Sequence, residues 1–80
     1  MQQLLLNILR ALVQAPEALE ITETSGDTTT YVEIRCDAGD LGVVIGKNGK
    51  TISAIRTLMN ATSHPPGRHV VVEVIEPEDA

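Results

Sequence analysis

Hydrophobic positions recur at two different spacings along this chain, and the changes of spacing divide it into six segments. In residues 2–14 apolar side chains recur every three or four positions, which is typical of an amphipathic helix. These positions are Leu5, Ile8, Leu9, Leu12 and Val13. Pro16 predicts the end of this helix, because proline cannot continue the backbone hydrogen bonding.

Two segments with strict alternation follow. Residues 18–24 alternate apolar and polar positions, and residues 28–37 do so more strongly. In the second segment Val32, Ile34 and Cys36 face one way, and the intervening polar and aromatic positions face the other. The turn residues 25–27 include Gly26, so the two segments are expected to form a β-hairpin.

The remaining chain predicts two helices and a strand. Residues 41–45 are expected to form a short helix with Asp40 as its N-cap, and residues 46–49 interrupt it. A second helix is expected over residues 50–61, with its apolar side chains on one face. Residues 63–67 read as a loop, residues 68–76 as a valine-rich strand and residues 77–80 as an acidic tail.

The element order is therefore α-β-β-α-α-β, within one domain spanning residues 1–80. Two helices separate the second strand from the third, which favours a parallel, right-handed connection between those strands. The fold class expected is α+β, with a three-stranded mixed sheet and three helices packed on one face.

Charge is unevenly distributed. Residues 41–72 contain four basic residues and no acidic one, whereas the rest of the chain has two basic and eleven acidic residues, so +4 and −9 give the net charge of −5. The four basic residues are Lys47, Lys50, Arg56 and Arg68. One locally positive segment in an acidic chain is compatible with a nucleic-acid partner.

Several classes of function are not expected. The longest apolar stretches are far shorter than the roughly 20 residues of a membrane span, and no secretion leader is expected. The single Cys36 suits a reducing compartment, so a cytoplasmic location is expected. His64 and His69 have no partners at ligand spacing, and no catalytic nucleophile has a base beside it. We therefore expect that the protein is not an enzyme and that it binds no metal, cofactor or small-molecule substrate.

The stretch from Val44 to Ile52 contains the candidate chemistry. Gly46 and Gly49 lie three apart between two helices and allow the backbone to turn tightly against another chain. The turn opens a helix whose first amides are unpaired, and Lys47 and Lys50 add positive charge there. This pattern is typical of a phosphate-binding turn. A Walker loop is excluded, because Val44 stands where that motif requires glycine.

The same residues resemble the KH family, whose hallmark is a helix–GxxG–helix with apolar flanks. The element order resembles the type II KH arrangement, and the whole chain is similar to the short bacterial single-KH proteins of the KhpA family. The resemblance rests on the helix ending before Pro16, the run 40–49, the run 54–58 and the run 67–70.

The resemblance implies a set of RNA-binding residues on the backbone clamp and beside it. They are Gly42, Val43, Gly46, Lys47, Asn48, Gly49, Lys50 and Arg56. Val43 departs from the family pattern, which commonly has a basic residue there. The resemblance also implies pairing with itself or with a larger KH-containing protein, RNA-chaperone activity, post-transcriptional regulation, and a link to cell-shape control.

The expected function is non-catalytic binding of single-stranded RNA with low sequence specificity. Two alternatives stay open. A degenerate KH domain could serve as a protein-interaction module, which Val43 and the acidic composition favour. The clamp could also bind single-stranded DNA, because it contacts phosphates and only a contact to the 2′-OH distinguishes RNA.

Overall fold

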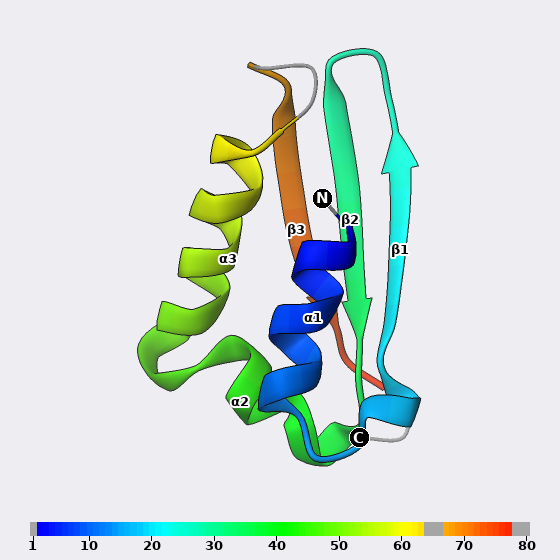
Figure 1. The fold of residues 1–80 in the computed structure, drawn as a ribbon, viewed down its shortest axis with the longest axis vertical. Coiled ribbons are helices and arrows are strands. Elements are labelled where there is room, and N and C mark those ends of the chain that lie inside the picture. The colour runs from blue at the N-terminus through cyan, green and yellow to red at the C-terminus, as the bar shows by residue number, and fades with distance from the viewer. Residues whose placement is uncertain (1, 64–66, 78–80) are drawn as a thin grey trace.

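The computed structural model describes residues 2–63 and 67–77, and its elements follow the predicted order α-β-β-α-α-β (Figure 1). The helices and strands are α1 (Gln2–Leu12), β1 (Glu20–Ser25), β2 (Thr29–Arg35), α2 (Leu41–Ile45), α3 (Lys50–Ala61) and β3 (His69–Ile75). Three 3₁₀ turns join them: η1 (Pro16–Ala18), η2 (Ala38–Asp40) and η3 (Lys47–Gly49). Residues 64–66 of the predicted loop 63–67 and residues 78–80 of the predicted tail 77–80 lie outside the described residues.

The sheet is mixed, as predicted. Its strand order is β1-β2-β3, with β1 antiparallel to β2 and β3 parallel to β2. Tyr31 in the central strand lies opposite Thr24 on one side and Val71 on the other. The hairpin produces the antiparallel pair, and the crossover through α2 and α3 produces the parallel pair.

Helices cover one face of the sheet, and no element of the described ranges 2–63 and 67–77 covers the other. Figure 1 shows α1 in front of the strands and α3 beside β3, with α2 at the lower end. The predicted alternation in β2 is confirmed, because Val32, Ile34 and Cys36 are buried whereas Tyr31 is exposed. The largest fully buried side chains of the core are Leu5, Leu9, Ile34, Val44, Met59 and Val72.

The first helix and strand are shorter than the pattern predicts. Helix α1 ends at Leu12 rather than at residue 14, and β1 begins at Glu20 rather than at residue 18. Pro16 occupies the start of η1, where its missing N–H group leaves no hydrogen bond unmade. The residues between these elements therefore form a 3₁₀ turn instead of extending either neighbour.

Asp40 has a different role from the predicted one. It occupies the N-cap position of α2, but its side chain makes no capping hydrogen bond there. Asp40 is 4% exposed, and its carboxylate accepts hydrogen bonds from the backbone N–H of Gln14 at 2.9 Å and of Ala15 at 3.1 Å. Asp40 thus ties the chain leaving α1 to the start of α2, which ends α1 before residue 14.

We predict that Asp40→Ala lowers the free energy of unfolding by about 2–3 kcal/mol, because two partly buried amides lose their acceptor. Asp37→Ala is the matched control, since the exposed Asp37 carboxylate accepts from the single amide of Gly39. We expect that control to cost about 0.5–1 kcal/mol. Urea unfolding of both variants measures the difference, and equal losses would contradict the role assigned to Asp40.

Candidate nucleic-acid interface

The turn between α2 and α3 has a backbone that most residues adopt only with strain. Gly46 has φ 81° and ψ 163°, Asn48 has φ 57° and ψ 27°, and Gly49 has φ 72° and ψ 15°. Positive φ is inexpensive for glycine and is tolerated by asparagine better than by most residues. The sequence Gly-Lys-Asn-Gly therefore places permissive residues at the three positions that need them.

Gly46 is required for a second reason, which is space. A Cβ atom at Gly46 would lie 2.7 Å from both the backbone nitrogen and the Cβ of Thr51, the second residue of α3. A Cβ atom at Gly49 would meet nothing within 4 Å. The first glycine thus allows α3 to start directly against the end of α2, whereas the second supplies only backbone freedom.

Two amide groups of this turn are available to a ligand. The N–H of Gly46 donates to the carbonyl of Gly42 at 2.8 Å, and the N–H of Gly49 donates to the carbonyl of Gly46 at 3.0 Å. In the described part of the chain the N–H groups of Lys47 and Asn48 make no hydrogen bond. These two amides, and not all four of the motif, are the free donors.

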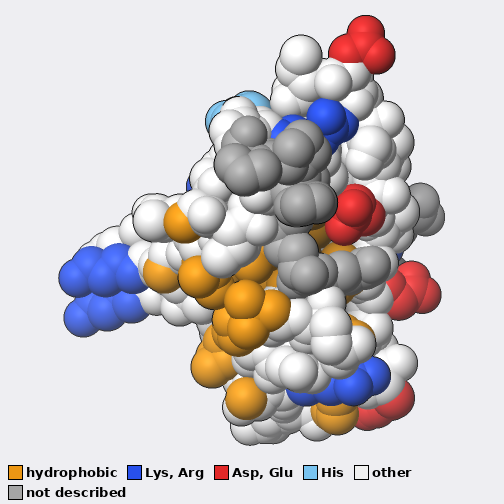
Figure 2. Space-filling model, turned by 45° about the horizontal axis from the view of Figure 1, so that its top comes forward, with side chains coloured by type: hydrophobic (Ala, Val, Ile, Leu, Met, Phe, Trp, Pro, Cys, Tyr) orange, Lys and Arg blue, Asp and Glu red, His pale blue; other side chains and the backbone are white. Residues whose placement is uncertain are grey.

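Positive charge accompanies the free amides. Lys47 and Lys50 are exposed, and neither forms an ion pair within the described residues. Figure 2 shows basic side chains standing out from the body at this end of the molecule, with acidic side chains on the opposite side. Two mobile ammonium groups beside two free amides suit a phosphate group.

Gly42 and Val43 lie on the solvent side of α2, immediately before the turn. Val43 is 40% exposed, while its neighbour Val44 is completely buried in the core. Gly42 has open space around its α-carbon. The structure therefore brings these two predicted residues to an exposed apolar surface next to Gly46.

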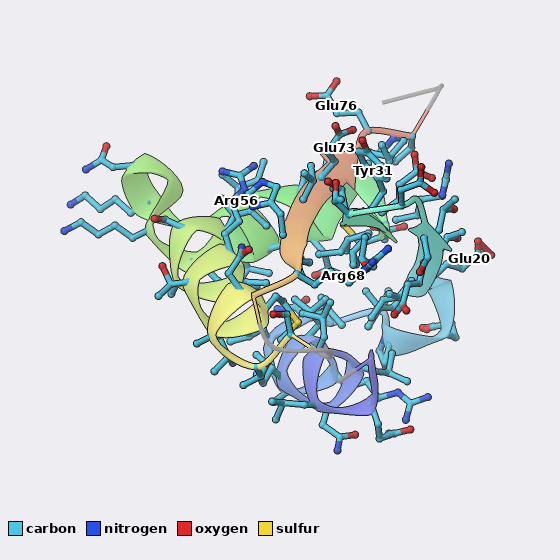
Figure 3. All side chains as sticks on the ribbon, turned by 90° about the horizontal axis from the view of Figure 1, so that it is seen from above. Glu20, Tyr31, Arg56, Arg68, Glu73 and Glu76 are labelled. Carbon is cyan, nitrogen blue, oxygen red and sulfur yellow. The ribbon has the colours of Figure 1, made fainter. Side chains whose placement is uncertain are left out.

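Arg56 lies further along α3, beside the outer edge of β3. Its Nε donates to the carbonyl of Val72 at 3.2 Å, and Figure 3 shows its position between α3 and β3. The two terminal nitrogens of the guanidinium group have no hydrogen-bond partner within residues 2–63 and 67–77. Arg56 is thus partly used by the fold, but it keeps donors for a ligand.

Asn60 is a residue whose role the sequence analysis missed. Its side-chain amide donates to the carbonyl of Val70 at 2.9 Å and accepts from the N–H of the same residue at 2.9 Å. It pairs with β3 as a neighbouring strand would. No periodicity identifies such an asparagine, because its role depends on where α3 meets the sheet.

The N–H donors of Arg68 are occupied by the fold. Its guanidinium donates to the hydroxyl of Thr30 at 2.7 Å and to the carbonyls of Gly26, Asp27 and Thr29 in the β1–β2 hairpin. It joins the start of β3 to the hairpin turn. The cationic side chains with N–H donors left for a ligand are therefore Lys47, Lys50 and Arg56.

Cys36 is buried at 5% exposure, as a small hydrophobic residue would be. Burial raises the pKa of the Cys36 thiol, and the carboxylates of Asp40 and Asp37 raise it further. The group is therefore a neutral thiol near pH 7. Across the described residues no three His, Cys, Asp or Glu side chains are grouped as metal ligands, and no helix there has the length and apolar character to cross a membrane.

Comparison with known proteins identifies similar chains across most of the sequence. A family model described as the KhpA/KhpB KH domain matches residues 2–74. Several bacterial proteins named RNA-binding protein KhpA are similar to this chain, three of which illustrate the similarity. The one from Clostridium acetobutylicum is 37% identical over 75 residues, covering 94% of this chain and all of its own. The one from Caldanaerobacter subterraneus is 39% identical over 75 residues, which cover 94% of this chain and all of the relative. The one from Chlamydia trachomatis is 37% identical over 76 residues, which cover 95% of this chain and 97% of the relative. No solved structure matches the chain significantly.

We predict that Gly46→Ala destabilises the protein far more than Gly49→Ala. Both substitutions put a side chain at positive φ, which costs about 1–2 kcal/mol. Only the Cβ at position 46 also collides with the backbone of Thr51, so its total loss should exceed about 3 kcal/mol. Urea unfolding of the two variants tests this difference, and equal losses would show that Gly46 and Thr51 can separate freely.

Proposed function

This chain belongs to the KhpA/KhpB KH-domain family, and from that membership and the geometry of the turn we propose that it binds single-stranded RNA through residues 46–49. The family is an RNA-binding family without enzymatic activity. The observation that supports this site is the pair of free amides at Lys47 and Asn48, lying between two exposed lysines.

In the proposed complex the sugar–phosphate backbone lies against the turn. The N–H groups of Lys47 and Asn48 donate to phosphate oxygens, and the ammonium groups of Lys47 and Lys50 neutralise their charge. Gly42 leaves room for the RNA strand beside α2, and Val43 offers an apolar surface to the bases. Arg56 uses its free terminal nitrogens further along the same strand.

Binding by one domain should be weak and only slightly selective for sequence. Most of the contacts are to phosphate, which is common to all nucleotides, and no aromatic side chain lies in residues 41–63 to stack on a base. Two linked or paired domains would bind more tightly, by about 10²–10⁴ over a single domain. We therefore propose that the protein acts with a second KH domain, from another copy of itself or from a larger KH-containing partner.

Weak, unselective binding of single strands also suits an RNA chaperone, which must release its substrate. We propose that this activity serves post-transcriptional regulation in the cytoplasm, where a free thiol such as Cys36 stays reduced. Any connection to cell-shape control would follow from the RNAs that are bound.

Two rival functions make different use of the same turn. If the domain is a protein-interaction module, the exposed apolar Val43 and the acidic surface contact a protein, and RNA affinity does not depend on the turn. If it binds single-stranded DNA, the phosphate contacts are the same and the 2′-OH makes no difference. Both rivals predict measurable outcomes.

We predict that Lys47→Gln with Lys50→Gln weakens binding to a single-stranded RNA oligonucleotide and flattens its salt dependence. Each phosphate neutralised contributes about −0.7 to the slope of log affinity against log salt. Removing two contacts should therefore reduce the slope by about 1.4. Fluorescence anisotropy at several salt concentrations measures both quantities.

Arg10→Gln is the control, because Arg10 lies on α1 and its loss should leave the slope unchanged. Lys47→Asp with Asn48→Asp should abolish RNA binding while preserving the fold, since aspartate tolerates the backbone at position 48. Unchanged RNA affinity in that variant, with loss of a protein partner, would support the interaction module. Equal affinity for matched RNA and DNA oligonucleotides would support the third function.

A further inference from the structure

Within the described residues no element covers the face of the sheet opposite the helices, and this face is chemically distinct. Figure 3 shows Tyr31 and Glu73 on this face, pointing away from α1. Tyr31 is the only aromatic residue of the chain and is 50% exposed. The exposed half of this ring is open to a partner, and tyrosine is enriched at protein interfaces.

Tyr31 borders a hollow of about 280 Å³ that crosses all three strands. The residues lining it are Thr24 from β1, Tyr31, Val32 and Glu33 from β2, and Val71 and Glu73 from β3. Tyr31 lies directly opposite Val71, so the hollow has an apolar side. Its other side is formed by the two glutamates.

Glu33 and Glu73 are direct neighbours across the parallel pair β2 and β3. Adjacent strands lie about 4.8 Å apart, so two like charges at opposed positions repel each other. Glu33 forms an ion pair with Arg35, in which Oε1 of Glu33 and Nη1 of Arg35 are 3.2 Å apart. The carboxylate of Glu73 has no hydrogen-bond or ion-pair partner within residues 2–63 and 67–77. A cation placed between the two carboxylates would relieve the repulsion.

We propose that this hollow is a docking site for an arginine side chain of a basic protein segment lying across the open face of the sheet. The guanidinium plane stacks on the ring of Tyr31 while its N–H groups donate to the carboxylates of Glu33 and Glu73. Arginine fits both features of the hollow. Its flat, weakly hydrated cation complements the carboxylates, and its apolar stem suits the apolar wall.

Other occupants fit the hollow less well. A lysine ammonium is more strongly hydrated and cannot pair with carboxylates in the two-pronged way that a guanidinium does. A nucleic acid would bring phosphates close to Glu33 and Glu73, which repel them. The site is therefore a protein-docking site, and it does not depend on RNA binding at the turn between α2 and α3.

The chain supplies its own probe for this site. Tyr31 is the only aromatic residue, so the intrinsic fluorescence of the whole protein reports on the hollow alone. We would titrate the full chain with an eight-residue peptide of alternating arginine and valine, blocked at both ends and free of aromatic residues. We expect a saturable change in tyrosine fluorescence, and at least about tenfold weaker binding when lysine replaces arginine.

Variants locate the binding. Glu33→Gln with Glu73→Gln should lower the affinity for the arginine peptide by more than about tenfold, since two charge-assisted hydrogen bonds are lost. Glu17→Gln with Glu23→Gln removes the same charge from η1 and from the helix-facing side of β1, and should change the affinity by less than about twofold. Urea unfolding checks that both variants fold, and Glu73→Gln alone provides the test if the double variant does not.

Three results would overturn the proposal. The arginine peptide could leave the fluorescence unchanged, the control variant could lose as much affinity as the Glu33 and Glu73 variant, or a peptide with glutamine in place of arginine could bind equally well. The last result would indicate a surface that pairs with any extended apolar segment.

Discussion

The close approach of Gly46 to Thr51 is the constraint on which the helical side of this molecule depends. Because no side chain stands between them, α3 begins directly against the end of α2. The chain between the two helices then reverses direction through the left-handed backbone conformation of Asn48 and Gly49. That turn directs the amides of Lys47 and Asn48 away from internal acceptors. The proposed phosphate contact is therefore a consequence of how tightly two helices are joined.

The direction of α3 also explains how the sheet edge is protected. An exposed edge strand invites pairing with other chains, and β3 is such an edge. Arg56 and Asn60, one helical turn apart, bond to the backbone of Val72 and Val70. Side chains of α3 thus take the place of a fourth strand. This use of Arg56, together with the binding of Arg68 to the hairpin, leaves the two lysines as the only cations of residues 41–72 that make no internal hydrogen bond in the described structure.

Local patterns predicted the elements, and long-range partners account for what they missed. Periodicity identified the helices and strands, and the two glycines identified the turn, because these signals act within a few residues. Asp40 was expected to cap its own helix, yet it bonds to residues 25 and 26 positions earlier. Asn60 and Arg68 likewise bond to strands distant from their own elements. A side chain that serves a distant segment leaves no local period, so these roles could not be predicted without the fold.

Charge separation links the two proposed interfaces. The free cations lie at the turn between α2 and α3, whereas Glu33 and Glu73 lie on the bare face of the sheet. A polyanion approaching a protein of net charge −5 is repelled from most of its surface, and so meets the lysines in a restricted orientation. The same field draws a basic protein segment to the bare face of the sheet. The acidic composition, which by itself opposes RNA binding, thus becomes the reason that RNA and a basic partner would occupy separate faces.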